Sequence, residues 1–405
     1  MHKRLKQSYR KVFTAGIING IGDRFNQVAV LAMVLSITGS GVAVGGALAI
    51  RIIPYLFFSP LGGWLSTVFS LKRIMVVTDL VRILFALSLL LVDGSKDLWI
   101  VYTVLFLLAG SEAIYQPVRR TYLSRHMDKE DLLRVNKLEQ VLLGIVLIMG
   151  SAVGGVVSYL FSPQLVFIIN AFTFLLAALI LLTLHETKVI ISSSKETVLS
   201  VIKCGWKVTM EHSLFRKLFL IEASISAADG IFNVLISVYA YQRFQMGDIG
   251  IGLFYGALGL GLVLSMWFPI GKKNVLMPFA IVTIFMEGLF QILLSQVNGF
   301  HYALLLFSFI SLSGGIGKGA MDTILMKQLP KESQGPVYSL FDMVSNVVMG
   351  MSMFVTGIML TLYPSPVMGS IAGGIFIIVS FAGFYGLHRD QSFQGVRVQD
   401  KGIEK

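Results

Sequence analysis

Long apolar segments recur along almost the whole chain, separated mostly by short polar connections. A helix needs about 20 mainly apolar residues to cross the hydrocarbon core of a bilayer, and twelve segments meet that length. They lie near residues 13–38, 41–67, 74–92, 97–122, 139–161, 163–184, 216–243, 250–271, 276–297, 300–326, 337–362 and 367–387. Because these segments are long and rich in Leu, Ile, Val and Gly, they predict an all-helical membrane protein rather than a barrel of short alternating strands.

Composition agrees with a membrane protein. The 405 residues are 55% hydrophobic and 14% charged, whereas an ordinary soluble domain carries roughly 25% charged residues. The single cysteine, Cys204, excludes a disulfide within the chain and a cysteine-based metal site. The basic start "MHKRLKQSYRK" is compatible with a signal peptide, but eleven further spans follow. We therefore expect an uncleaved first span.

Basic residues gather on one side of the predicted membrane. Of the 33 Lys and Arg, 27 fall in the two terminal segments, in alternate connections or at the span ends that border them. Cytoplasmic loops of membrane proteins carry such an excess. We expect both termini in the cytoplasm, and the net charge of +11 then requires no nucleic-acid partner.

One connection, residues 185–215, is long and basic and separates six spans from six. It predicts a first half at 1–184, this cytoplasmic linker, a second half at 216–390 and a tail at 391–405. Within the linker, Val198, Ile202, Trp206 and Met210 are spaced by four residues. That spacing favours a helix lying in the membrane interface over a partner-binding site.

The two halves echo each other in sequence. A glycine precedes a Pro-x-Gly motif by 19 residues twice, at Gly41 and Pro60 and at Gly250 and Pro269. An acidic residue and a glycine recur at an offset of 203, as Glu139 and Gly154 and as Asp342 and Gly357. These matches suggest two parallel repeats that can rock around a central site.

Several stretches resemble the major facilitator superfamily, and the similarity covers essentially the full chain. They include "NGIGDRFNQVAVLAMV", "DLVRILFA", "YQPVRRTYLSRHMDKEDLLRVNKLEQ" and "MKQLPKESQGPVYSL". The first half is most similar to the branch of bacterial exporters that includes macrolide efflux proteins and the enterobactin exporter. The resemblance implies twelve helices in two six-helix halves, a monomer in the bacterial plasma membrane, and a cavity lined by spans one, four, seven and ten.

The loop between spans two and three departs from the family pattern. In "GGWLSTVFSLKR", Thr67 and Val68 stand where the family carries Asp and Arg. The retained positions are Gly63, Leu65, Lys72 and Arg73. Asp79 and Arg82 lie three residues apart on one helix face, so they either replace the missing latch contact or pair with each other within the span.

A second motif in the fifth span resembles the exporter pattern Gly-Pro-x-x-Gly-Gly. The chain reads "GSAVGG" here, with Ser151 in place of the proline. Gly150, Gly154 and Gly155 still permit the close helix approach that small residues allow in lipid. The motif favours export, and helix packing alone is the alternative.

Charged residues inside spans are costly, about 2.5–3.5 kcal/mol each on insertion scales, so they are expected to face the interior, water or a partner. Those in the predicted cavity-lining spans are Asp23, Arg24, Glu112, Glu222, Asp229, Lys318 and Asp322. We expect Glu112 and Asp229 to lie on a proton or substrate pathway. Lys318 and Asp322 are four residues apart, so they either join that pathway or neutralise each other.

The polar stretch in the first span predicts one wall of the cavity. Asp23, Asn26 and Gln27 share a helix face, and Arg24 is turned from it by about 100°. A carboxylate in a partly dry cavity can exchange a proton near neutral pH. The alternative is structural: Asp23 pairs with Arg24 or Arg51, or caps a helix break nearby.

Motifs for other chemistry are weak. His126 and Asp131 have an acyltransferase-like spacing, but the family resemblance accounts for the same loop. There is no phosphate-binding loop and no His/Cys cluster in the sequence, so we expect no ATP hydrolysis, no cofactor and no metal.

The sequence therefore predicts a proton-coupled exporter, not an enzyme, that moves amphipathic drugs or a secreted metabolite by alternating access. Its partners are the small substrate, protons and the lipid bilayer. The alternatives are a siderophore, peptide-antibiotic or lipid exporter of the same fold, and a non-transporting membrane sensor or interaction protein.

Overall fold

The computed structural model describes residues 2–39, 41–160, 163–185, 197–268 and 276–389, and the regular elements in these ranges are helices. The first group comprises α1 (His2–Thr38), α2 (Gly41–Ala49), α3 (Ile53–Val68), α4 (Leu71–Ser88), α5 (Leu98–His126), α6 (Leu132–Leu160) and α7 (Pro163–Leu182). The second comprises α9 (Ser213–Val238), α10 (Gly247–Leu264), α11 (Leu276–Gln296), α12 (Phe300–Gln328), α13 (Gln334–Met359) and α14 (Ser365–Arg389). Between them lies α8 (Val198–Glu211). The all-helical prediction is confirmed.

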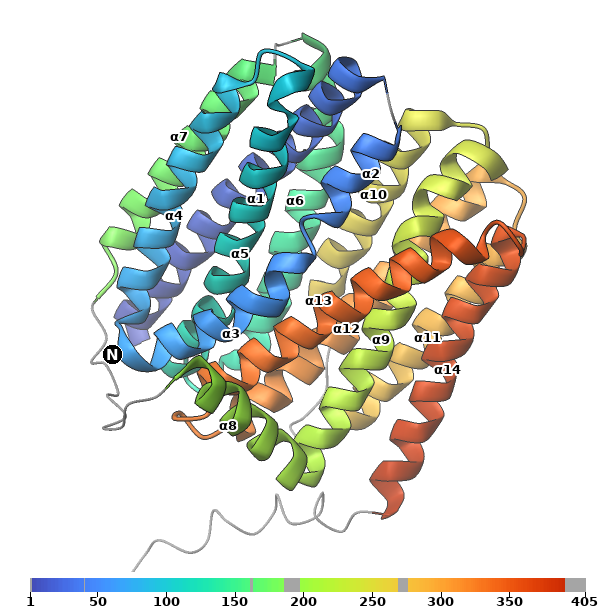
Figure 1. Cartoon of the computed structure of the whole chain (residues 1–405). Coiled ribbons are helices and arrows are strands. Elements are labelled where there is room, and N and C mark those ends of the chain that lie inside the picture. Colours follow the sequence, from blue (N-terminus) through green and yellow to red (C-terminus); the bar gives the residue numbers. More distant parts are fainter. Residues whose placement is uncertain (1, 40, 161–162, 186–196, 269–275, 390–405) are drawn as a thin grey trace, which may run out of the picture.

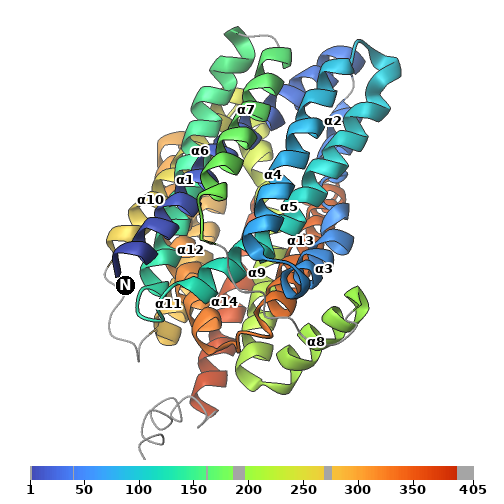
Figure 2. The ribbon, with the colours of Figure 1, turned by 90° about the vertical axis from the view of Figure 1, so that its left-hand side faces the viewer.

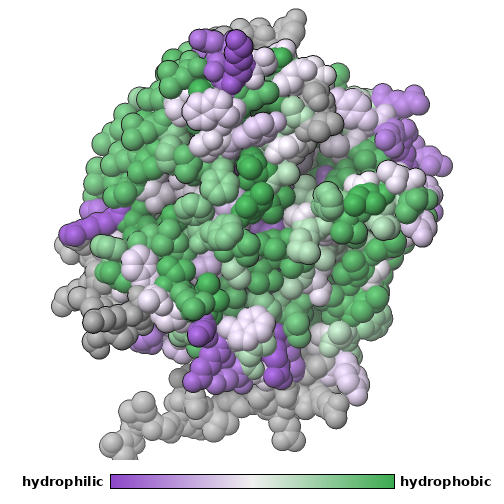
Figure 3. Space-filling view, viewed as in Figure 1, coloured by the Kyte–Doolittle hydropathy of each residue, from purple (hydrophilic) through white to green (hydrophobic). Residues whose placement is uncertain are grey.

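Within the described ranges, ten helical segments are long and apolar enough to cross a membrane. Two more helices, α1 with 37 residues and α6 with 29, pack in the same bundle against α7 and α10. The middle of α1 is less apolar because it carries Asp23, Arg24, Asn26 and Gln27. Figure 3 shows the matching surface, a broad apolar expanse with hydrophilic residues mainly toward its margins.

The predicted span at 41–67 is present, with Gly46–Val68 long and apolar enough to cross a membrane, but its helix is interrupted between Ala49 and Ile53. Pro54 follows the break and has no backbone N–H to donate to a helix. The amides of Arg51 and Ile52 bond instead to Leu48 and Ala49, at 3.4 and 3.1 Å, in tighter three-residue turns. The break changes the direction of the chain and gives α3 its own tilt (Figure 1).

The helices form two halves that lie side by side (Figures 1 and 2). In the first half α1 packs on α6 and α7, and in the second α11 packs on α12 and α14. The halves meet mainly along two helix pairs, α3 with α13 and α6 with α10, and α5 also contacts α13 and α6 contacts α12. In the second pair, a methyl group on Gly144 would lie 2.6 Å from the carbonyl oxygen of Gly259, so only glycine fits there.

The hydrophobic core distinguishes the two ends of the bundle. We call the end that carries Lys72, Arg73 and Lys331 the basic end. There a single core contains residues of both halves, among them Tyr122 and Tyr338. At the opposite end the buried residues of the described part divide into cores that are built mainly from one half each, and Leu147 of α6 also packs on the core of the second half. The hydrophobic core is therefore shared between the halves at the basic end and mainly separate at the other.

Small residues close the contact at the basic end. Ser59 Oγ of α3 donates to the carbonyl oxygen of Ser339 in α13 at 3.0 Å. A methyl group on Gly63 would lie 2.3 Å from Ser339 Oγ, and one on Gly335 would lie 2.0 Å from Ser66 Oγ. This reciprocal approach of two backbones leaves no room for a larger side chain at either glycine.

The linker helix α8 begins at a capping box formed by Thr197 and Ser200. It packs on α13 through Gly205, where a methyl group would come within 2.6 Å of the Pro336 carbonyl oxygen. Trp206 contacts Phe219 edge to face and remains 50% exposed. The predicted helix is present, and its exposed tryptophan is compatible with the expected place at the membrane interface.

Candidate transport site

Arg82 of α4 is the centre of a buried ion cluster in the first half. Its side chain is fully enclosed, with one guanidinium nitrogen bonded to the Glu112 carboxylate and another 3.6 Å from Asp79 Oδ1. The guanidinium also lies over the rings of Tyr115 and Phe174, 5.2 and 5.5 Å from their centroids. Asp79 and Arg82 thus pair within the span, and Arg82 contacts residues of its own half.

Glu112 of α5 is the accessible member of this cluster. Its carboxylate accepts from Arg82 and from Gln116, and its side chain keeps 27% exposure inside the bundle. Asp23 and Arg51 lie within electrostatic range of it. A partly exposed carboxylate is thus held by a buried cation.

Asp23 has no ion pair or hydrogen bond to its carboxylate in the part of the chain that the structure describes. The helix α1 runs unbroken through this point, so Asp23 does not cap a helix break. Arg24 instead donates to Gln27 at 3.4 Å and lies in electrostatic range of Tyr255 in α10. Asn26 is only 4% exposed, so it belongs to the packed interior of the first half.

Two adjacent arginines of α5 form ion pairs with acids in different halves. Arg119 bonds to Glu139 of α6 within the first half. Arg120 reaches across to Asp342 of α13, with 2.8 Å between Nη1 and Oδ1. The second pair is an ion bridge between the halves. Tyr55 lies in electrostatic range of both Glu112 and Asp342.

The second half holds its own cluster around Lys318 of α12. Its ammonium group bonds to Glu222 of α9 and lies 3.9 Å from Asp322 Oδ1. Ser345 also donates to Glu222, at 3.1 Å. Asp322 is thus a secondary partner of Lys318, and the main neutralising group is Glu222.

Asp229 of α9 lies in this second cluster, in electrostatic range of Glu222 and Lys318. It is therefore not grouped with Asp23 and Glu112, which surround Arg82. The charged residues of the predicted pathway form two adjacent groups, one in each half, rather than one.

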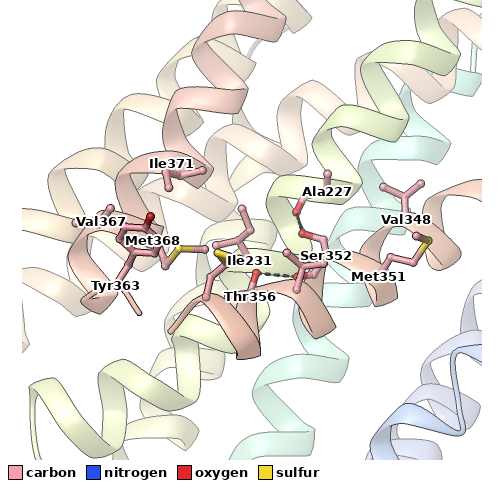
Figure 4. Close-up of a pocket in the computed structure, with 12 residues that line it drawn as sticks. Ala227, Ile231, Val348, Met351, Ser352, Thr356, Tyr363, Val367, Met368 and Ile371 are labelled. Atoms are coloured by element: carbon pink, nitrogen blue, oxygen red, sulfur yellow. Dashed lines mark hydrogen bonds between the residues drawn. The ribbon is translucent and has the colours of Figure 1, made fainter. Parts of the chain in front are cut away.

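A cavity of about 690 Å³ lies between α9, α13 and α14, near the end opposite the basic end (Figure 4). It is lined by Ala227, Ile231, Val348, Met351, Ser352, Val355, Thr356, Met359, Tyr363, Val367, Met368 and Ile371. The two lining Ser and Thr hydroxyls are satisfied, since Ser352 donates to the Ala227 carbonyl and Thr356 to the Ser352 carbonyl. The cavity thus offers an apolar wall with adaptable methionines and does not include the charged clusters.

The residues expected to act in gating have varied surroundings. Gly63 lies at the contact with α13, whereas Lys72 and Arg73 begin α4, where Ser70 Oγ caps the Arg73 amide at 3.4 Å. A methyl group on Gly150 would lie 2.6 Å from Cβ of Arg24, so this glycine lets α6 approach α1. Gly154 and Gly155 fall in residues 151–160, whose surroundings are outside the described part.

No group of three or more His, Cys, Asp or Glu side chains in the described ranges is placed to hold a metal ion. The polar chemistry of the interior is carried by carboxylates, guanidinium groups and one ammonium group. Such groups can bind protons or charged substrates.

A two-lobed bundle of membrane-spanning helices, with ion clusters inside and one end closed, defines a secondary-transporter fold. The Major Facilitator Superfamily profile matches residues 12–353. This chain belongs to that superfamily, and the fold predicted by resemblance is confirmed.

Relatives and solved structures agree with this assignment. The uncharacterized MFS-type transporter YvqJ of Bacillus subtilis is 22% identical over 361 residues, covering 84% of this chain and 83% of the relative. The human organic anion transporter MFSD10 superposes with a TM-score of 0.76 at 10% identity, over 94% of this chain and 99% of that one. The Escherichia coli fucose:proton symporter FucP has a TM-score of 0.73 at 12% identity, over 93% and 98% of the two chains. At these identities the structural matches show the fold alone.

Sequence reasoning missed the roles of Arg119 and Arg120. The sequence did contain a signal for them. Glu139 and Asp342 occupy equivalent positions in the two repeats, and each is paired with one of these arginines. A buried acid at a repeated position requires a cation, and the adjacent arginines of α5 are the basic residues that reach both.

Proposed function

We propose that this chain is a proton-coupled transporter that exports amphipathic molecules from a bacterial cell by alternating access. The family supports transport, and the resemblance of the first half to macrolide and enterobactin exporters supports export. We place the basic end in the cytoplasm, as the distribution of Lys and Arg favours. With that orientation, the core shared by both halves lies on the cytoplasmic side, and the mainly separate cores lie toward the outside.

The position of Glu112 is the observation that carries the proposal. Glu112 is partly exposed and bonded to Arg82, which also faces Asp79 and lies in electrostatic range of Asp23. A proton arriving on Glu112 neutralises it and frees Arg82 for Asp79 and Asp23. A proton can thereby change which carboxylates the buried cation holds, and this is what coupling to a gradient requires.

The cavity near the outer end supports an apolar or amphipathic cargo. Met351 and Tyr363 are 66% and 51% exposed at its rim, whereas Met368 is 4% exposed in its wall. Flexible methionine side chains can accommodate apolar groups of varied shape. A cargo with an apolar body would be held by such contacts while its polar part faces the ion clusters.

The ion bridge between Arg120 and Asp342 supplies a latch for the closed basic end. Thr67 stands where the family carries an acidic residue, and within the described part its hydroxyl bonds just to the Trp64 carbonyl oxygen, at 2.8 Å. We propose that Arg120 and Asp342 take over the missing contact. The bridge must open when the basic end opens to admit cargo.

Transport by inverted membrane vesicles tests the proposal. Acidifying the vesicle lumen should drive uptake of a substrate found in a panel of amphipathic dyes and drugs. We expect Glu112→Gln and Asp23→Asn each to lower gradient-driven uptake at least tenfold, while Glu130→Gln, on the exposed connection to α6, leaves it unchanged. Undiminished uptake in both interior variants would overturn the proton pathway.

A further inference from the structure

The linker helix α8 covers the contact between the two halves at the basic end. It packs on α3 of the first half and on α13 and α9 of the second (Figure 1). Val201 is 1% exposed, and Gly205 approaches α13 so closely that a methyl group there would lie 2.6 Å from the Pro336 carbonyl oxygen. Because α8 is packed on both α3 and α13, these two helices cannot separate without breaking contacts of α8.

The packed face of α8 fixes the direction of a second face, which is exposed. Val201, Gly205 and Thr209 are spaced by four residues and are buried against the bundle. Leu199 and Trp206 share the exposed face, since they are two helical turns apart, and they are 60% and 50% exposed. Tryptophan is enriched at membrane–water interfaces, so this face is suited to contact with the bilayer rather than with water.

Two lysines accompany this exposed apolar face. Lys203 lies on the same face as Leu199 and Trp206, is exposed, and has no ion pair within the described part of the chain. Lys207 borders the face and lies 3.9 Å from Glu211, in a pair whose side chains are 73% and 60% exposed. Such exposed pairs are weak, so a phosphate group can compete for Lys207. Apolar side chains, an indole and basic groups together are typical of helices that bind anionic bilayers.

The size of the face favours a bilayer over a folded protein partner. A stable protein interface buries about 800 Å² on each partner. The exposed large apolar side chains of α8 are two in number, Leu199 and Trp206. A bilayer requires no such area, because an interfacial helix can be held by a few anchoring side chains and by the attraction between its lysines and lipid phosphates.

We propose that α8 is a lipid-dependent clamp on the contact between the halves, and that its partner is anionic phospholipid in the leaflet at the basic end. Leu199 and Trp206 enter the boundary between headgroups and acyl chains, and Lys203 and Lys207 contact phosphate groups. A lipid that holds α8 in its position on both α3 and α13 favours the joined arrangement over the open one. The lipid binding is independent of the cargo, whereas its effect on opening rests on the proposed alternating access.

Spin-label accessibility in nanodiscs tests the position of α8 in the full-length protein. Cys204 is the single cysteine, is exposed, and is turned from Leu199 by about 140° around the helix. A nitroxide on Cys204 should therefore be reached by a water-soluble relaxation agent. A nitroxide on Leu199→Cys, in a Cys204→Ser background, should be reached by oxygen dissolved in the lipid instead. Aqueous exposure of both labels would overturn the proposal and leave α8 as a surface for a soluble partner.

The role of lipid charge is tested by distances between spin labels on the two halves at the basic end, again in the Cys204→Ser background. Nanodiscs of phosphatidylcholine alone are compared with nanodiscs that also contain phosphatidylglycerol. We expect phosphatidylglycerol to raise the ratio of closed to open molecules about fivefold, the effect of one lysine near an anionic surface. Replacing both Lys203→Gln and Lys207→Gln should abolish this gain. Lys129→Gln is the control, because Lys129 is exposed on the connection between α5 and α6 at the same end.

The outcomes separate this proposal from the proposed proton pathway. No gain with phosphatidylglycerol, or an equal loss of the gain in Lys129→Gln, would overturn the clamp, since the second result would reflect only the overall charge of the basic end. A gain that requires the two lysines of α8 supports the clamp even if Glu112→Gln and Asp23→Asn leave transport undiminished. In that case the clamp stands and the proton pathway fails.

Discussion

The two halves share one helical plan but differ in the balance of their interior charges. Apart from the pairs Arg119–Glu139 and Arg120–Asp342, the first half sets Arg24, Arg51 and Arg82 against Asp23, Asp79 and Glu112, three cations for three acids. The second sets Lys318 against Glu222, Asp229, Glu287 and Asp322, one cation for four acids. Since uncompensated acids in a membrane interior bind protons, the second half has the greater capacity to change its charge.

The central cations of the two halves, Arg82 and Lys318, also differ in how firmly they are held. Arg82 is enclosed, held by two carboxylates and covered by two aromatic rings. Lys318 keeps 30% side-chain exposure and has partners that compete for it. A planar guanidinium suits a fixed multidentate site, whereas an ammonium on a flexible stem can change partners. The first half therefore holds its ions in place, and the second half can redistribute them.

Removing each central cation should give the largest effect and the clearest test of this difference. Arg82→Met leaves Asp79 and Glu112 without a counter-charge in a buried site, which costs about 3–5 kcal/mol of stability. Lys318→Met should cost less, about 1 kcal/mol, because Lys318 is itself 30% exposed and Glu222 keeps the hydrogen bond from Ser345. Thermal unfolding in detergent, monitored for both variants, measures the contrast.

Arg82→Lys is the control, since it retains the charge but loses the forked geometry, and it should fall between wild type and Arg82→Met. Equal destabilisation by Arg82→Met and Lys318→Met would contradict the distinction between a fixed and an adaptable half.

The sequence predicted the helices well because each span must bury about 20 apolar residues, and that requirement is local. The predicted span 276–297 coincides with α11 to within one residue, for example. The break between α2 and α3 was missed, although Pro54 marks it, because proline is also tolerated within membrane helices. Local patterns thus fix the presence of a helix more firmly than its continuity.

Partners of charged residues were harder to predict, because pairing depends on how helices pack. Spacing alone suggested that Lys318 pairs with Asp322, four residues away, but the closer partner is Glu222, 96 residues away in the chain. The same holds for Asp23, whose sequence neighbour Arg24 is directed toward Gln27 instead. A single sequence shows which side chains need partners, and the fold selects them.

Breaking the ion bridge between Arg120 and Asp342 should have an effect of intermediate size. Asp342→Asn keeps the shape but removes the charge that holds Arg120, so the closed basic end loses an ion pair whose members are 27% and 9% exposed. We expect the ratio of closed to open molecules to fall about tenfold, which corresponds to about 1.4 kcal/mol. Distance measurements between spin labels on the two halves at the basic end would report it.

Glu139→Gln is the matched comparison for that experiment, because it breaks the equivalent pair with Arg119 inside one half. It should lower stability without changing the distance between the halves. A similar change of distance in both variants would show that the bridge to Asp342 has no special role as a latch.

The smallest effect on stability is expected for a substitution of Asp322. Asp322 lies 3.9 Å from Lys318 with 18% side-chain exposure, in the geometry of a pair spaced by four residues on a helix, which is worth below about 0.5 kcal/mol. Asp322→Asn removes one of four acids from the second half while leaving the bond between Lys318 and Glu222 intact. Stability in thermal unfolding should therefore stay within that range, whereas Glu222→Gln should destabilise more strongly. If Asp322→Asn were instead the more damaging variant, Lys318 would depend on its neighbour in the same helix, and the second half would be as fixed as the first.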